Sequence, residues 1–121
     1  MEWMPKVWGR TRHILATDDV SIWDLDVLAG GYCSKHRHAT RANLFVVVSG
    51  TVDVEMWFPN GKPTVWRLTA GAKAVLRVPA GVWHRFTAVE ASRLVEMYMP
   101  DGGALDEADI EREDVGGLRA A

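Results

Sequence analysis

The chain has 121 residues, of which 48% are hydrophobic and 25% are charged, and its formal net charge is −2. This length allows one domain with one core, and the composition is that of an ordinary globular protein. The small negative charge argues against nucleic acid as a partner. No apolar run approaches the ~18 residues that a membrane-spanning helix needs, so we expect no membrane partner.

The N-terminus and the cysteine content bear on the cellular compartment. Residues 1–6 lack the basic and then apolar pattern of a secretory signal. Cys33 is the single cysteine, so no disulfide can form within the chain, which is typical of a reducing environment. We therefore expect a cytoplasmic protein.

Alternating apolar and polar residues predict a series of β-strands. The alternation is clearest over 22–28 and 51–58. The second of these runs is followed by Asn60-Gly61, a pair that tolerates the positive φ angles of a tight hairpin. Further strand-like runs lie at 44–49, 64–68, 74–78, 83–89 and 93–99.

Many short strands between Gly and Pro turns, without helical periods, predict an all-β fold, an antiparallel sandwich or barrel. We place this domain at residues 1–100, with strands from about 20 to 99 and an N-terminal segment packed outside. Residues 101–121 differ in charge, since they carry a net charge of −5 while residues 1–100 carry +3. We interpret them as an acidic C-terminal tail that is solvated and either weakly helical or disordered.

Three histidines are spaced so that one metal ion can hold them. His36 and His38 are two residues apart, so on a strand both side chains point to the same side. His84 begins another strand directly after a Pro79–Gly81 turn. Neutral imidazole is the commonest protein ligand for transition metals. We therefore predict that the three converge on one divalent ion, which the sequence leaves open among Fe, Mn, Ni, Zn and Cu.

These segments resemble the two sequence motifs of the cupin family. The matching positions are Gly31, His36, His38, Asn43 and Gly50 for the first motif and Gly71, Pro79, Gly81 and His84 for the second. The resemblance covers roughly residues 20 to 99, and it implies a single antiparallel double-sheet jelly-roll barrel with a metal site inside. The chain departs from the family at one ligand, because Asn43 stands where the family has glutamate.

Asn43 changes the expected charge of the site. Its amide oxygen can bind a metal, but as a neutral and weaker ligand than a carboxylate. Three histidines and an asparagine therefore leave a divalent ion with two positive charges, where a glutamate would leave one. That charge favours an anionic or chelating substrate. Direct ligation by Asn43 and a role in orienting a metal-bound water are equally consistent with the sequence.

Two more residues are candidates for catalysis or substrate contact. Arg41 lies in the loop between His38 and Asn43, so it is either a residue that bends over the mouth of the site and contacts substrate or a solvated surface residue. Tyr32 has the same parity as His36 along the chain, so we expect it to line the cavity. Either Tyr32 or a metal-bound water would then be the acid or base.

A weaker resemblance concerns the substrate. Parts of the chain are similar to the cupin domain of mannose-6-phosphate isomerase-like proteins, namely residues 7–10, 34–38, 45–54 and 78–84. This resemblance implies a sugar or a sugar phosphate as the small molecule that the site binds.

Three functions are consistent with these residues. We favour a metal-dependent enzyme with isomerase-like chemistry on a small polar or anionic metabolite. The second is a three-histidine non-haem iron dioxygenase, because cupin oxygenases that act on thiols lack the glutamate. The third is a non-catalytic cupin that binds a small ligand, because no acid or base is evident.

The strand at 44–49 bears on the oligomeric state. It is apolar on both faces, so Leu44, Val46 and Val48 would place apolar side chains on the outside of a barrel. Exposed apolar patches usually meet a partner, and we therefore expect a homodimer.

Overall fold

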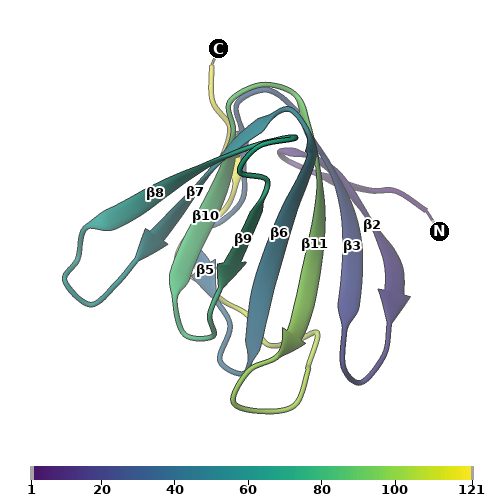
Figure 1. Cartoon of the computed structure of the whole chain (residues 1–121), viewed down its shortest axis with the longest axis vertical. Coiled ribbons are helices and arrows are strands. Elements are labelled where there is room, and N and C mark those ends of the chain that lie inside the picture. The colour runs from purple at the N-terminus through teal and green to yellow at the C-terminus, as the bar shows by residue number, and fades with distance from the viewer. Residues whose placement is uncertain (1, 121) are drawn as a thin grey trace.

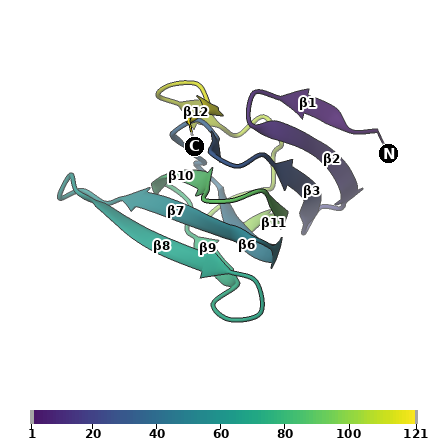
Figure 2. The same cartoon turned by 90° about the horizontal axis from the view of Figure 1, so that it is seen from above.

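The protein is described by a computed structural model that covers residues 2–120. Two antiparallel β-sheets face each other, as the two views show (Figure 1; Figure 2). Every regular element of the described residues is a strand, and none of these residues forms a helix long and apolar enough to cross a membrane. Met1 and Ala121, the outer ends of the two predicted regions, lie outside the described residues.

The first sheet has six strands. Their order across the sheet is β1 (Met4–Lys6), β2 (Gly9–Ala16), β3 (Ser21–Val27), β11 (Ser92–Pro100), β6 (Arg41–Ser49) and β9 (Val75–Val78). The N-terminal segment is therefore more than a packed arm, because its residues form the β1–β2 edge of this sheet. β11 lies between β3 and β6 and so places its side chains at the centre of the sheet.

The second sheet is built around β10. The strands β8 (Pro63–Thr69), β7 (Thr51–Trp57) and β10 (Trp83–Ala88) follow one another across it. The short strands β4 (Gly31–Tyr32) and β5 (His36–Arg37) pair with β10 on its other side. They pair in turn with β13 (Gly117–Leu118) and β12 (Glu111–Arg112), respectively.

The predicted all-β double-sheet architecture is confirmed, but the predicted barrel is not closed. Closure requires every strand to have a neighbour on both sides. Among the described strands, β8 pairs only with β7 and β9 pairs only with β6, so each sheet keeps a free edge. The result is an open sandwich, with its apolar core between the sheets. The core includes Leu25, Phe45, Val52, Val54, Phe86 and Leu94.

The C-terminal segment, residues 101–120, differs from the weakly helical or disordered tail that its composition predicts. It contains β12 and β13 and runs along the edge of the second sheet. Basic residues of the sheet attract its acids, and this pairing explains the ordered path. The ion pairs are Lys35–Glu113 at 3.3 Å, Arg37–Glu111 at 2.9 Å and Arg85–Asp114.

Candidate metal centre

The three predicted histidines converge in the structure. His36 on β5 and His84 on β10 are directly opposite each other in the antiparallel pairing of these strands. His38 is the residue immediately after β5. Their candidate ligand atoms all lie within 4.8 Å of one another. All three side chains are buried, with 5%, 2% and 0% exposure for His36, His38 and His84. The cluster is therefore shielded from bulk water.

The turn before His84 brings that residue to the cluster. Gly81 has a φ of 83°, a left-handed conformation that favours glycine. Its N–H donates to the His38 carbonyl over 2.7 Å, so the turn is tied to the chain that carries the other two histidines. The Pro79–Gly81 turn thus performs the role that the sequence predicts for it.

Backbone carbonyls orient all three imidazole rings. A carbonyl oxygen only accepts hydrogen bonds, so each Nδ1 that lies beside one carries the ring proton, and Nε2 keeps its lone pair. Such second partners are typical of metal-ligating histidines. The distances are 2.6 Å from His36 Nδ1 to Ser34 O, 2.7 Å from His38 Nδ1 to Asp109 O and 2.8 Å from His84 Nδ1 to Val82 O.

Burial also keeps the rings uncharged. Desolvation lowers the pKa of His36 to about 4 and that of His38 to about 3, and it lowers the pKa of His84 well below its ordinary value. At neutral pH all three are neutral imidazoles. This is the protonation state that a metal requires of a histidine ligand.

Two orphaned polar atoms test whether these residues fit a metal ion. Within the described residues, His38 Nε2 and Asn43 Oδ1 are buried without a hydrogen-bond partner. Asn43 is completely buried, and its amide nitrogen lies 3.3 Å from His84 Nε2. Unpartnered buried acceptors are costly, and a divalent cation is a group that would satisfy both. The residues therefore fit a metal, with Asn43 beside the histidines; direct ligation by Asn43 stays a prediction.

Glu96 is a site residue that our sequence reasoning missed. The Asn43 amide donates to its carboxylate over 3.0 Å, and desolvation raises the pKa of Glu96 to about 7. The strand alternation contains the information that would have revealed it. Leu94, Glu96 and Tyr98 have one parity on β11, so an inward Leu94 implies an inward Glu96.

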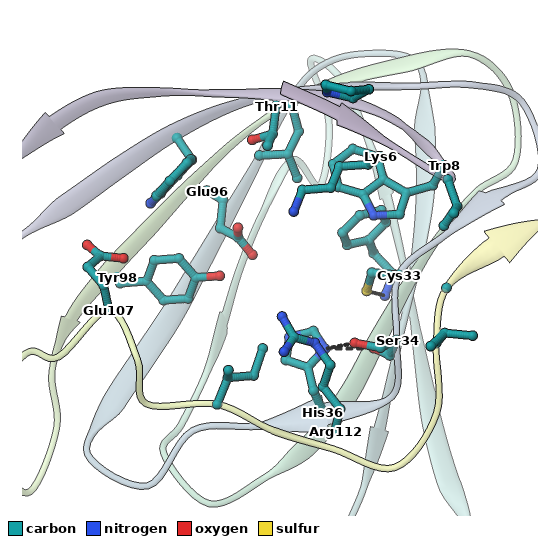
Figure 3. Close-up of a pocket in the computed structure, with 18 of the residues that line it drawn as sticks. Lys6, Trp8, Thr11, Cys33, Ser34, His36, Glu96, Tyr98, Glu107 and Arg112 are labelled. Atoms are coloured by element: carbon teal, nitrogen blue, oxygen red, sulfur yellow. Dashed lines mark hydrogen bonds between the residues drawn. The ribbon is translucent and has the colours of Figure 1, made fainter. Parts of the chain in front are cut away.

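A cavity of about 580 Å³ opens between the sheets next to the cluster (Figure 3). His36 belongs both to the cluster and to the wall of this cavity. Figure 3 shows the His36 ring, the Glu96 carboxylate and the Tyr98 hydroxyl around a common space. The charged groups of the wall are Lys6, Arg41, Arg112, Glu96 and Glu107.

Arg41 lines this cavity, but it is a buried residue at the start of β6, and so it is neither bent over the mouth nor solvated as the sequence predicts. Only 4% of it is exposed. Its guanidinium lies 3.9 Å from the centre of the Tyr98 ring and 3.4 Å from a Glu107 carboxylate oxygen. These contacts hold a permanent positive charge inside the protein.

Tyr32 does not line the cavity. Its ring instead lies near the Arg85 and Arg119 guanidinium groups, at 5.2 and 4.6 Å from the ring centre. The parity argument fails because β4 ends at Tyr32 and β5 begins at His36, so regular alternation is interrupted between them. Cys33 and Ser34 are consequently both buried. Tyr98 is the tyrosine that the structure brings to the cavity.

Comparison with solved structures shows where this fold occurs. A mutant of oxalate decarboxylase from Bacillus subtilis matches 93% of this chain with a TM-score of 0.77 at 15% identity. A structure of the same enzyme at pH 4.6 matches with a TM-score of 0.76 at 15% identity, and a structure used to study its Mn(II) centres matches with a TM-score of 0.74 at 14% identity. The chain spans only 30% of the length of each of these structures. No family model and no curated protein matches the sequence.

At this level of identity the likeness establishes the fold. It agrees with the order of the two motifs along the chain and with the three histidines that the fold brings together. The chain therefore has the fold of these structures, which is the double-sheet fold that its resemblance to the cupin motifs implies.

Proposed function

We propose that the protein is a metal-dependent enzyme that acts on a small anionic metabolite held between its two sheets. The observation that carries this proposal is the position of His36, which joins the three-histidine cluster to a cavity. Three cationic side chains and two carboxylates line that cavity. A divalent ion held by neutral ligands would add further positive charge. The site is therefore suited to an anion.

His36, His38 and His84 would hold the ion through Nε2, with Asn43 beside them. When bound, the ion would supply a Lewis acid that polarises a substrate oxygen. Its identity stays open among Fe, Mn, Ni, Zn and Cu. The Mn(II) centres described for a structure with the same fold make Mn(II) the first ion to test.

Two similarities support an anionic substrate. The similar structures described above are of oxalate decarboxylase, whose name identifies a small dicarboxylate as its substrate. The resemblance to mannose-6-phosphate isomerase-like proteins supports a sugar phosphate. Carboxylate and phosphate share the charge and the oxygen acceptors that arginine recognises.

Glu96 is the acid or base that the sequence analysis did not identify. It lies in the cavity wall and accepts a hydrogen bond from Asn43. With its pKa raised to about 7, its carboxyl group can both give and take a proton at neutral pH. Isomerisation needs such a group to move a proton on the substrate. This residue supports an enzyme over a binding module.

The test begins with elemental analysis of freshly purified protein and of protein reloaded with each metal after chelation. The loaded forms are then assayed for aldose–ketose interconversion over a panel of sugar phosphates and for turnover of small carboxylates, including oxalate. We expect turnover that is lost on chelation and in His36→Ala. A fully loaded protein that turns over no sugar, sugar phosphate or carboxylate would contradict the proposal.

A three-histidine non-haem iron dioxygenase is the second candidate. It is favoured by the composition of the cluster, which among the described residues contains histidines and no carboxylate. Oxygen consumption by the Fe(II)-loaded protein with a thiol substrate distinguishes it, because the isomerase needs no oxygen. The third candidate, a non-catalytic binding protein, would be favoured by purified protein that contains no metal and by ligand binding that survives His36→Ala.

We also propose a cytoplasmic location. Cys33 is free and buried, with its Sγ accepting the Phe86 N–H over 3.2 Å. This thiol packs as a small apolar side chain in the core and has no disulfide partner, which supports a reducing compartment. Localisation of a tagged full chain tests this proposal.

A further inference from the structure

We propose that Asp109, in the C-terminal segment, is a positioning residue that holds His38 in the tautomer able to bind a metal. The inference rests on the proposed metal function and extends the site to a part of the chain outside the cupin motifs.

The Nδ1 atom of His38 lies between two groups with opposite requirements. Asp109 O is 2.7 Å away, and Arg41 Nε is 3.1 Å away. The carbonyl oxygen only accepts, so its contact requires a proton on Nδ1. The Arg41 N–H only donates, so its contact requires a lone pair on Nδ1. The ring can satisfy only one of them at a time.

The choice decides whether His38 can be a ligand. With the proton on Nδ1, the lone pair of Nε2 is free for a metal ion. With Nδ1 accepting from Arg41, the proton of the neutral ring sits on Nε2, which then cannot ligate. Nε2 is buried without a partner among the described residues, so an N–H there would be an unsatisfied donor. The shorter contact to Asp109 favours the ligating tautomer.

The Asp109 side chain keeps its own carbonyl beside His38. Its carboxylate accepts hydrogen bonds from the Ala39 N–H over 2.7 Å and from the Thr40 N–H over 2.8 Å. The Thr40 hydroxyl donates a third bond to it over 3.0 Å. These donors belong to the two residues that directly follow His38. The carboxylate therefore anchors the C-terminal segment at the point where its backbone meets the ring.

Three single variants of the full chain, and one double variant, test the proposal. Asp109→Ala removes the anchor, and Asp109→Asn keeps one acceptor oxygen. Glu111→Ala is the matched control, because it breaks an exposed ion pair with Arg37 in the same segment, 2.9 Å long, and leaves the anchor intact. Two quantities are measured: the tautomer of His38 in the metal-free protein, by imidazole nitrogen NMR, and the affinity for Zn(II), by calorimetry.

We expect wild type and Glu111→Ala to show the Nδ1–H tautomer and equal affinity. In Asp109→Ala the fraction of the Nδ1–H tautomer should fall, and the Zn(II) affinity should be about 10–100-fold weaker. A loss of this size is usual when a metal ligand loses its hydrogen-bond partner. Asp109→Asn should fall between them. Adding Arg41→Met to Asp109→Ala removes the competing donor and should restore both the tautomer and much of the affinity.

A folded Asp109→Ala with the wild-type tautomer and affinity would overturn the proposal. If that variant fails to fold, as judged by circular dichroism, Asp109→Asn takes over the test, and wild-type values there would overturn it equally. Failure of wild type to bind Zn(II) or any other divalent ion would refute the proposed metal function. The tautomer measurement needs no metal, so it would still decide the role of Asp109.

Discussion

The Asn43 amide and the Glu96 carboxylate form a hydrogen bond of 3.0 Å between the neighbouring strands β6 and β11. Both side chains are buried, and Asn43 also lies 3.3 Å from His84 Nε2. The protein thus has a carboxylate next to the position where the cupin motif places its glutamate, but on another strand. The Asn43 amide therefore lies between the histidine cluster and the Glu96 carboxylate, so a change of charge at position 43 affects both.

This link changes what Asn43→Glu should do. A carboxylate at position 43 would lower the charge of a metal-loaded site and tighten divalent binding, on the order of tenfold. It would also face Glu96, and two buried carboxylates at this distance cannot both be ionised easily. We expect Asn43→Glu alone to increase the metal affinity little, and Asn43→Glu combined with Glu96→Gln to give the full increase of about tenfold. Calorimetry with Zn(II) measures the affinity of both variants, and equal affinities would contradict an interaction between positions 43 and 96.

Glu96 should make the stability of the metal-free protein depend on pH. Its pKa is raised from 4.5 to about 7 in the fold by desolvation. The neutral carboxyl therefore contributes stability fully below pH 4.5, and the contribution is lost as pH rises through 7. At 1.36 kcal/mol per pKa unit it amounts to roughly 3 kcal/mol. Urea unfolding at pH 5 and pH 8 should show wild type losing most of this amount relative to Glu96→Gln. Parallel pH profiles of the two proteins would disprove the assignment.

His84 and His13 provide a matched pair of alanine substitutions. His84→Ala removes a candidate ligand and should weaken Zn(II) binding by at least about 100-fold, more than the loss of an outer partner. His13 lies on β2, stacked on Trp23 with ring centres 4.3 Å apart, and it does not belong to the cluster. His13→Ala should leave the affinity unchanged. Equal losses in the two variants would place the metal elsewhere.

Arg112 should contribute to anion binding. It is the ladder partner of His36 and lines the cavity, and its charge lowers the His36 pKa further, after desolvation. No carboxylate of residues 2–120 forms an ion pair with it, so its guanidinium is available to a ligand. Arg112→Gln should weaken oxalate binding to the Mn(II)-loaded protein by about tenfold or more. The control is Arg119→Gln, whose guanidinium lies over the Tyr32 ring away from the cavity, and similar losses in both would argue against a specific role.

The homodimer stays a prediction, and the outer face of the first sheet supports it. Val48 on β6 and Val75 on β9 are each 57% exposed, next to the half-buried Leu44 and Val46. We propose that a second copy covers this apolar face. Light scattering should give about twice the chain mass of 13.5 kDa, and Val48→Lys should reduce it to the single mass. A wild-type mass of 13.5 kDa at micromolar concentration would refute the dimer.

The local pattern of the sequence determined the features that depend on strand periodicity and turn chemistry. Period-two alternation located most strands and placed His36 and His38 on one side. The Pro79–Gly81 turn placed His84 at the start of a strand that could face them. These inferences succeeded because a strand alternates by itself, whatever packs against it. The same reasoning failed at Tyr32, where the strand is interrupted before His36.

Only the tertiary structure decided which segments meet. The order of β3, β11 and β6 across the first sheet brings Glu96 to Asn43, a contact between residues 53 positions apart. The docking of the C-terminal segment brings Asp109 to His38 across 71 positions. In both cases the contact depends on long-range strand pairing and charge complementarity, which no local window of the sequence contains. The acidic C-terminal segment, whose composition predicts a solvent-exposed tail, therefore lines part of the site.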